Sequence, residues 1–284
     1  MTYYFIPNLS TQAGTCLTVE NWEQVGVEMA SFSLSALLMK PGIDLLKTLP
    51  NLATYVGWNK TLVLNASWSL RPTDDVYRLR SIYDGGKSQY TRDDLLALII
   101  QLAPQMVLLP QGFCRMDDTL WLSLPDDIFP FFPVNECPSY TGQRPYGIYM
   151  ECDDDVTETV EEQLQSHPDR PKYVVGDMSP TVLQDLVMLG AQYLESDKPA
   201  NDAYHGLVYH RDEVITVQDA SEALEFSVID PTCDCPTCQQ QLTRAYLHHV
   251  YEHTPLLCYR FLIQHNILEF VRNCMQKTHA VPYK

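Results

Sequence analysis

Three cysteines and one histidine carry the clearest chemistry in this chain. Cys233, Cys235 and Cys238 have the spacing C-x-C-x2-C, and His265 follows near the far end of a segment with helical periodicity. Thiolates and an imidazole at such spacing are typical ligands of a tetrahedral zinc ion. Because four protein ligands leave no open position for water, the set predicts a structural Zn2+ that fastens a loop to a helix.

The residues around this set resemble the C-terminal part of the tRNA-guanine transglycosylases, the queuine tRNA-ribosyltransferase family. Its members have C-x-C-x2-C, then S/T-R-A-Y-L-H-H, then a helix that ends in His-Asn. The matching segments here are 243–249 and 265–266, with one extra residue within 239–241. Weaker similarity covers most of the chain, at Phe5-Ile-Pro7, Gly57-Trp58 and Asp84-Gly-Gly-Lys87. The resemblance implies a (β/α)8 barrel that exchanges guanine in tRNA for a 7-deazaguanine base.

The pattern of apolar residues agrees with an α/β fold of this kind. Strand-length apolar runs alternate with helical periods from Tyr3 to Asp197, which predicts a parallel sheet in a TIM-type barrel. The chain is shorter than catalytic members of the family, and only one strand is evident between Gly112 and Lys172. We therefore expect an incomplete barrel, with one strand or one β/α unit lost. The predicted domains are a barrel at 1–202 and a zinc-binding subdomain with a long C-terminal helix at 203–284.

The chain departs from the family where the resemblance places the chemistry. A catalytic aspartate and two glycines of the family fall on the segment that contains Asn65 and Trp68. An amide cannot exchange a proton at neutral pH as a carboxylate can, and an indole would occupy the space of a flat base. The nucleophilic aspartate is replaced by Glu195, whose charge lies one methylene further out. We expect no catalytic residue and interpret these three as degenerate active-site positions.

Charge and composition restrict the partners. The chain has 19 basic and 36 acidic residues, a net charge of −17, which argues against nucleic acid because phosphate binding depends on Lys and Arg. The sequence starts without the basic n-region of a signal peptide and contains no run of about 20 apolar residues, so we expect neither a signal peptide nor membrane insertion. Nine cysteines without paired spacing indicate a reducing compartment, so we expect a cytoplasmic protein.

Three functions are compatible with these observations. The first is a catalytically inactive descendant of the family, a structural or adaptor subunit of a multiprotein complex. The second is the non-catalytic accessory subunit of a queuine tRNA-ribosyltransferase, which also has Glu-Ser in place of Asp-Cys, as in Glu195-Ser196 here. The third is an active base-exchange enzyme that uses Glu195. In the first two, the zinc subdomain would bind a protein partner or a second copy of the chain.

Overall fold

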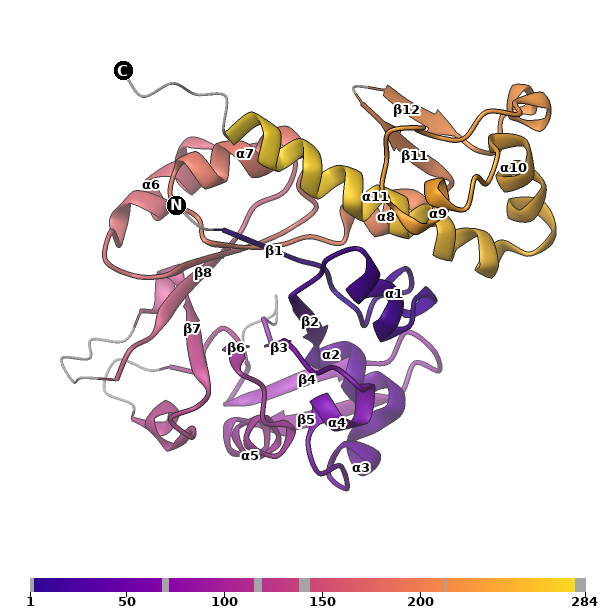
Figure 1. The fold of residues 1–284 in the computed structure, drawn as a ribbon. Helices are drawn as coiled ribbons and strands as arrows, with labels where there is room; N and C mark the ends of the chain where they lie inside the picture. The colour runs from indigo at the N-terminus through magenta and orange to yellow at the C-terminus, as the bar shows by residue number, and fades with distance from the viewer. Residues whose placement is uncertain (1–2, 68–71, 115–118, 138–143, 212, 279–284) are drawn as a thin grey trace, which may run out of the picture.

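Eight parallel strands form a barrel in the computed structural model, which describes residues 3–67, 72–114, 119–137, 144–211 and 213–278 (Figure 1). The strand order is β1-β10-β9-β8-β7-β6-β3-β2. β1 meets β2 through a parallel bridge between Asn8 and Ser31, where the Leu9 amide donates to the Ser31 carbonyl at 2.9 Å. The strands are β1 (Tyr4–Ile6), β2 (Met29–Ser33), β3 (Thr61–Asn65), β6 (Met106–Leu108), β7 (Phe129–Pro133), β8 (Gly147–Glu151), β9 (Lys172–Val175) and β10 (Tyr193–Glu195).

The TIM-type fold is confirmed, and the shortening lies in the connections rather than in the number of strands. Between β6 and β7 the described residues contain only the short helix η3 (Leu120–Ser123), and between β7 and β8 only η4 (Val134–Glu136). A full α-helix usually stands after each strand of such a barrel. In its described residues, the segment therefore has its strand but not the α-helices that usually cover such a strand.

β7 is the strand that the sequence did not reveal, because prolines normally argue against a central strand. Its prolines lie where no ladder hydrogen bond is lost. Pro130 precedes the first residue paired with β8, Phe131, which pairs with Gly147. Pro133 follows the last residue paired with β6, because that pairing ends at Phe131. An incomplete barrel would need side chains such as Phe129, Phe131 and Phe132 to cover a gap in its wall, but these phenylalanines are part of the wall itself.

The remaining helices of the barrel follow the strands along the chain. The two helix starts predicted from capping residues are confirmed, because the side chain of Thr91 accepts from the Asp94 amide and that of Ser179 from the Val182 amide. The helices are η1 (Gly14–Cys16), α1 (Val19–Gln24), α2 (Leu34–Leu37), η2 (Leu38–Gly42), α3 (Ile43–Leu46), α4 (Leu52–Val56), α5 (Arg92–Leu102), α6 (Glu158–Ser166), α7 (Pro180–Met188) and α8 (Lys198–Tyr204).

Side chains fill the inside of the barrel. The Phe131 ring lies with its centroid 5.3 Å from that of Tyr173 and 5.5 Å from that of Tyr193. The Tyr149 hydroxyl donates to the Leu109 carbonyl at 2.8 Å. Such layers make the interior a packed core. One buried cluster takes a residue from each of seven strands: Ile6, Met29, Val63, Leu108, Phe131, Tyr149 and Tyr173.

A separate antiparallel hairpin follows β3. It consists of β4 (Val76–Arg80) and β5 (Lys87–Thr91), and β5 leads directly into α5. Its inward-facing rings, Tyr77 and Tyr90, are buried, and the Tyr77 hydroxyl donates to the Gln111 carbonyl at 2.9 Å. The hairpin is thereby fixed beside the end of β6.

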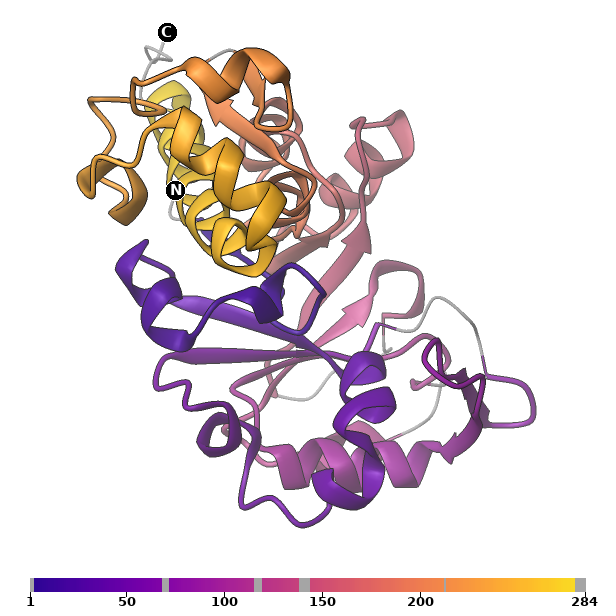
Figure 2. The same ribbon diagram turned by 90° about the vertical axis from the view of Figure 1, so that its right-hand side faces the viewer.

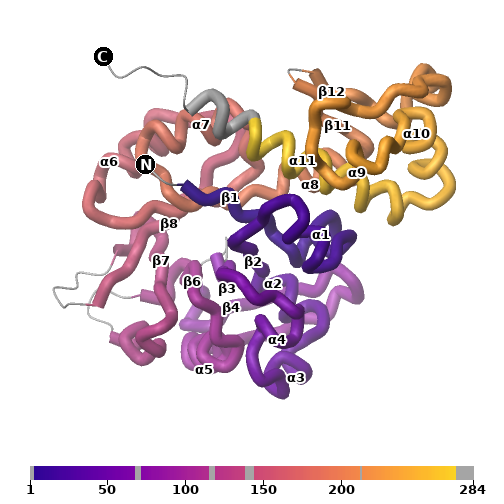
Figure 3. Tube along the Cα trace, in the orientation of Figure 1, coloured from indigo at the N-terminus to yellow at the C-terminus, as the bar shows by residue number. Residues whose placement is uncertain are grey.

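The C-terminal part contains the short strands β11 (Leu207–His210) and β12 (Glu213–Thr216), then η5 (Ala220–Leu224), α9 (Pro236–Gln239), α10 (Arg244–His253) and α11 (Pro255–Thr278). The single bent helix expected over 242–271 is two helices, because the chain turns at Thr254 and Pro255 has no amide hydrogen for a continuous ladder. α11 extends from the zinc subdomain back across α8 to α7 (Figure 3). The domain division expected after residue 202 falls inside α8 and stays a prediction.

Within the described part of the chain, none of the helices combines the length and apolar character needed to cross a membrane.

Candidate functional site

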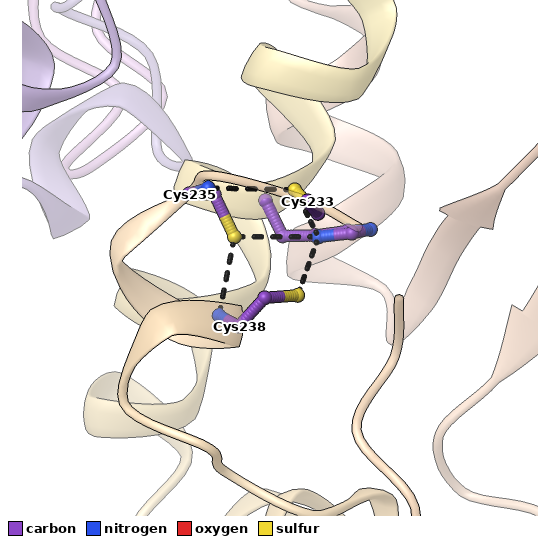
Figure 4. Close-up of side chains that lie close together, drawn as sticks. Cys233, Cys235 and Cys238 are labelled. Atoms are coloured by element: carbon purple, nitrogen blue, oxygen red, sulfur yellow. Dashed lines mark hydrogen bonds between the residues drawn. The ribbon is translucent and has the colours of Figure 1, made fainter. Parts of the chain in front are cut away.

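The four predicted metal ligands meet in one buried cluster. Cys233 and Cys235 lie just before α9, Cys238 lies in it, and His265 comes from α11. Their ligand atoms all lie within 4.8 Å of one another, and Figure 4 shows the cysteine sulfurs turned toward a common centre. His265 Nδ1 is 3.7, 3.4 and 3.5 Å from the sulfurs of Cys233, Cys235 and Cys238. Ordinary zinc bond lengths in a tetrahedron give a nitrogen-to-sulfur edge of about 3.5 Å.

Neighbouring groups orient these ligands for a metal. His265 Nε2 donates to the Tyr209 carbonyl at 2.7 Å, which leaves Nδ1 free to coordinate. The amides of Cys235 and Cys238 donate to the sulfurs of Cys233 and Cys235, at 3.4 and 3.3 Å. Hydrogen bonds among the three cysteine side chains lower the pKa of the Cys233 thiol and raise the pKa of the Cys238 thiol, so one thiolate is already favoured within the cluster. The cluster fits a structural zinc ion with all four positions supplied by the protein.

Asn266, next to the last ligand, connects the cluster to the rest of the fold. Its side-chain oxygen accepts from the Tyr209 amide at 3.0 Å. Its amide group donates to the carbonyls of Pro199 and Leu207, at 3.1 and 2.8 Å. The His265-Asn266 pair therefore fixes α11 to both α8 and β11, so the metal site and the helix packing depend on each other.

The predicted position of the nucleophile, Glu195, lies at the end of β10 and points into the barrel. Its side chain is only 2% exposed. Oε1 accepts from Asn8 Nδ2 at 3.1 Å and from Asn65 Nδ2 at 2.9 Å, and Oε2 accepts from the Tyr173 hydroxyl at 2.8 Å. Burial raises the pKa of Glu195, and the hydrogen bonds from Asn65 and Tyr173 only partly oppose this rise.

Asn65 is fully engaged as well. Its side-chain oxygen accepts from the Ser67 amide at 2.9 Å and from the Ser67 hydroxyl at 2.5 Å, while its nitrogen donates to Glu195. The two degenerate positions are therefore direct hydrogen-bond partners, which their separation in the sequence did not reveal. Trp68, the third, lies outside the described residues.

Sequence reasoning missed the other two donors, Asn8 and Tyr173. The strand pairing explains why they are close, because Ile6 is in register with Glu195 and Asn8 follows β1 at the same end of the barrel. Tyr173 lies on the adjacent strand β9. The only sequence signal was an amide immediately after the first strand, a residue type that is common in loops and therefore uninformative alone.

A second carboxyl, Asp197, lies two residues beyond Glu195. Its Oδ1 is buried, and no hydrogen bond to it occurs within the described part of the chain. Burial raises the pKa of Asp197 to about 7, the Thr11 hydroxyl lowers it, and the charges of Asp177 and Glu195 raise it further. A buried carboxyl with so strongly raised a pKa is a candidate functional group, and no sequence pattern marked Asp197 as one.

Comparison with known proteins agrees with the position of the zinc motif. A sequence profile described as queuine tRNA-ribosyltransferase matches residues 147–280, from β8 past the end of α11. The queuine tRNA-ribosyltransferase of Dehalococcoides mccartyi (strain CBDB1) is 24% identical over 97% of this chain and 81% of its own length. Over its C-terminal part, the chain is similar to the queuine tRNA-ribosyltransferase family. The predicted family resemblance is therefore confirmed.

Similarity to the family is strongest in short stretches. The queuine tRNA-ribosyltransferase of Desulfosudis oleivorans is 36% identical over 104 residues, which are 37% of this chain and only 27% of that protein. That of Desulforamulus reducens is 23% identical over 97% of this chain and 85% of its own length. These relatives support similarity to the family, and the activity of this chain is a separate question.

Proposed function

We propose that this chain is a catalytically inactive member of the queuine tRNA-ribosyltransferase family that acts as a structural or adaptor subunit of a cytoplasmic protein complex. The position of Glu195 is the observation that carries the proposal. A nucleophile must reach the sugar carbon directly, with its attacking oxygen within near-contact distance. Both oxygens of Glu195 instead accept hydrogen bonds from the protein, and the side chain is buried.

The packed interior supports the same proposal. Phe131, Tyr149 and Tyr173 are almost fully buried inside the barrel, where the Phe131 and Tyr173 rings are in contact and the Tyr149 hydroxyl donates to the Leu109 carbonyl. Binding a purine-sized base beside Glu195 would require these rings to move. Tyr173 would also have to give up its hydrogen bond to the carboxylate, which leaves a buried polar group without a partner.

The zinc subdomain is the surface that we propose for the protein partner. Leu224 is 77% exposed and Phe226 is 73% exposed, although both are large and apolar. The amides of Arg244 and Ala245 donate to the carbonyls of Ser227 and Glu225, which places the Phe226 segment against the start of α10. Tyr246 is also exposed there. Neighbouring apolar side chains on a solvent-exposed face are typical of an interaction site.

A catalytic queuine tRNA-ribosyltransferase is the partner that we favour, which makes this chain its accessory subunit. Two observations support this assignment. The chain is similar to the queuine tRNA-ribosyltransferase family, and it has Glu195-Ser196, the pair by which it resembles the non-catalytic accessory subunit. A symmetric pair of identical chains is the alternative occupant of the same surface.

Asp197 is the one observation that favours an active enzyme. A carboxyl with a pKa of about 7 can act as a general base, and its charge interacts with that of Glu195. This alternative predicts turnover by the purified chain alone, lost on Asp197→Asn.

Affinity purification of the tagged chain from its own cell, followed by mass spectrometry, tests the proposal. We expect a catalytic homologue to co-purify in a fixed ratio, and we expect Tyr246→Asp to remove it while Tyr55→Asp, at an exposed tyrosine of the barrel helix α4, retains it. A chain recovered as an isolated monomer would contradict an adaptor role.

A further inference from the structure

Two exposed histidines lie side by side on α10. His249 and His253 are four residues apart, a spacing that places two side chains on the same face of a helix. The centroids of their rings are 4.4 Å apart, the interplanar angle is 56°, and both residues are exposed. Figure 2 shows α10 in the foreground, on the outer surface of the zinc subdomain. The pair is therefore open to solvent.

The histidine that precedes this pair is bound by the protein, whereas the pair itself is not. His248 Nδ1 donates to the Val217 carbonyl at 2.8 Å, and its Nε2 lies 3.8 Å from the Glu252 carboxylate. Within the part of the chain that the structure describes, the rings of His249 and His253 contact each other and have neither a hydrogen bond nor an ion pair. Their ring nitrogens are thus available to a ligand from solution.

Two imidazoles at this spacing are suited to hold a metal ion. In the H-E-x-x-H pattern, two histidines four residues apart on a helix bind one zinc ion. Bonds of about 2.0–2.1 Å at roughly a right angle put the two nitrogens about 2.9 Å apart. Rings whose centroids are 4.4 Å apart reach that separation by rotation of their exposed side chains.

The position of the pair along α10 favours a cation. The helix ends at His253, and the Thr254 amide closes the last turn on the Val250 carbonyl at 2.8 Å. The carboxyl end of a helix carries the negative end of the helix dipole, which stabilises positive charge there. The net charge of −17 also attracts cations to the chain.

The pair differs from the Cys3His cluster in the number of ligands. Among the described residues, only that cluster brings three or more histidine, cysteine or carboxylate ligands together. An ion bound by His249 and His253 would therefore keep open positions for water or another ligand. Tyr246 lies three residues before His249 on α10, so the pair borders the surface proposed for the protein partner.

We propose that His249 and His253 form a second metal site, which binds one exchangeable divalent transition-metal ion such as Cu2+, Ni2+ or Zn2+. Imidazole nitrogen suits these ions, whereas Mg2+ and Ca2+ require oxygen ligands. Within the series, Cu2+ binds most tightly. The inference rests on α10 alone and is independent of the proposed adaptor role.

Calorimetric titration of Ni2+ into the untagged, full-length, zinc-loaded chain tests the site. We expect one Ni2+ per chain in addition to zinc, and no binding of Mg2+. His249→Asn and His253→Asn each leave a single imidazole, so each should weaken Ni2+ binding about tenfold or more, because the second bond is no longer intramolecular. Zinc content and melting temperature should stay unchanged, since both side chains are exposed.

His205→Asn is the matched control. His205 is an exposed histidine just after α8, its Nδ1 bonds to the Asn201 carbonyl at 2.8 Å, and no histidine lies four residues from it. This variant should bind Ni2+ as the wild type does. Equal weakening in all three variants, or unchanged binding by both α10 variants, would overturn the proposal. So would Ni2+ uptake matched by zinc release in metal analysis of the same samples, because it would place the ion in the Cys3His cluster.

Discussion

The key side chains of the zinc cluster and those at the carboxyl end of the barrel differ in where they point and what they bond to. In the zinc cluster, each ligand points to a common centre, and His265 Nε2 has a separate carbonyl acceptor that leaves Nδ1 for the metal. At the barrel end, the Glu195 side chain is buried, and its carboxylate oxygens accept hydrogen bonds from Asn8, Asn65 and Tyr173. The comparison teaches that the side chains of the zinc cluster converge on a site for an ion, whereas Glu195 makes its hydrogen bonds within the protein.

Removal of one metal ligand should have the largest effect. Cys235→Ser is expected to release zinc and unfold the C-terminal subdomain, because zinc binding contributes on the order of 10 kcal/mol to the folding of small zinc sites. Metal analysis and circular dichroism measure this. Cys258→Ser is the matched control, since Cys258 is also buried but only donates to the Leu247 carbonyl, and it should keep its zinc. A zinc-free yet folded Cys235→Ser variant would contradict the structural role.

Two substitutions of Glu195 sharpen the contrast at the barrel end. Glu195→Ala leaves the donors of Asn8, Asn65 and Tyr173 without an acceptor, so we expect a loss of about 3 kcal/mol in the free energy of unfolding. Glu195→Gln can keep the three contacts, because the Tyr173 hydroxyl can also accept from an amide. It should be as stable as the wild type or more stable at pH 8. Urea unfolding of both variants measures these free energies of unfolding, and an equal loss of stability in both would contradict the hydrogen-bonding role.

The pH dependence of stability tests the burial of Asp197. Its pKa is about 7 in the folded chain against an ordinary value of 3.8, so the protonated form is favoured by folding. The contribution to stability is complete below about pH 4 and is lost as the pH rises through 7, by about 2–4 kcal/mol at most. Asp197→Asn should flatten this part of the curve and stabilise the chain at pH 8. An unchanged slope in urea unfolding from pH 5 to 8 would show that Asp197 is not responsible.

Introducing a charge on the exposed face of 242–265 should change association with little effect on stability. Leu256 is 71% exposed, so Leu256→Asp is expected to shift the free energy of unfolding by no more than about 0.5 kcal/mol. Partner capture or self-association, measured by sedimentation, should nevertheless be lost. Leu262→Asp is not a usable control because Leu262 is fully buried. If Leu256→Asp leaves association intact, the acidic segment 151–162 becomes the next surface to test.

The sequence predicted what depends on local spacing. The C-x-C-x2-C motif located the metal ligands, and apolar alternation located seven of the eight barrel strands. β7 was missed because Pro130 and Pro133 are harmless only at the ends of its pairing, which depends on where β6 and β8 begin and end. Likewise, the contact between Asn8 and Glu195 joins residues from opposite ends of the barrel sequence and follows from closure of the sheet.

The exposure of apolar residues also could not be predicted from local spacing. Leu247, Leu256 and Leu262 recur at helical spacing, which by itself predicts one apolar stripe, but two of them are fully buried while Leu256 is exposed. The break before Pro255 starts a new helix with a different face toward the core. Arg80 and Lys87 likewise become neighbours only when β4 pairs with β5, which the sequence alone does not show.

Incorporation of radiolabelled guanine into tRNA by the purified, zinc-loaded chain tests the central claim most directly. The wild type is expected to show no incorporation above a protein-free control, and Glu195→Gln is expected to behave identically. Incorporation by the wild type that Glu195→Gln abolishes, in a variant with unchanged zinc content and melting temperature, would show that Glu195 acts on substrate and would contradict the account.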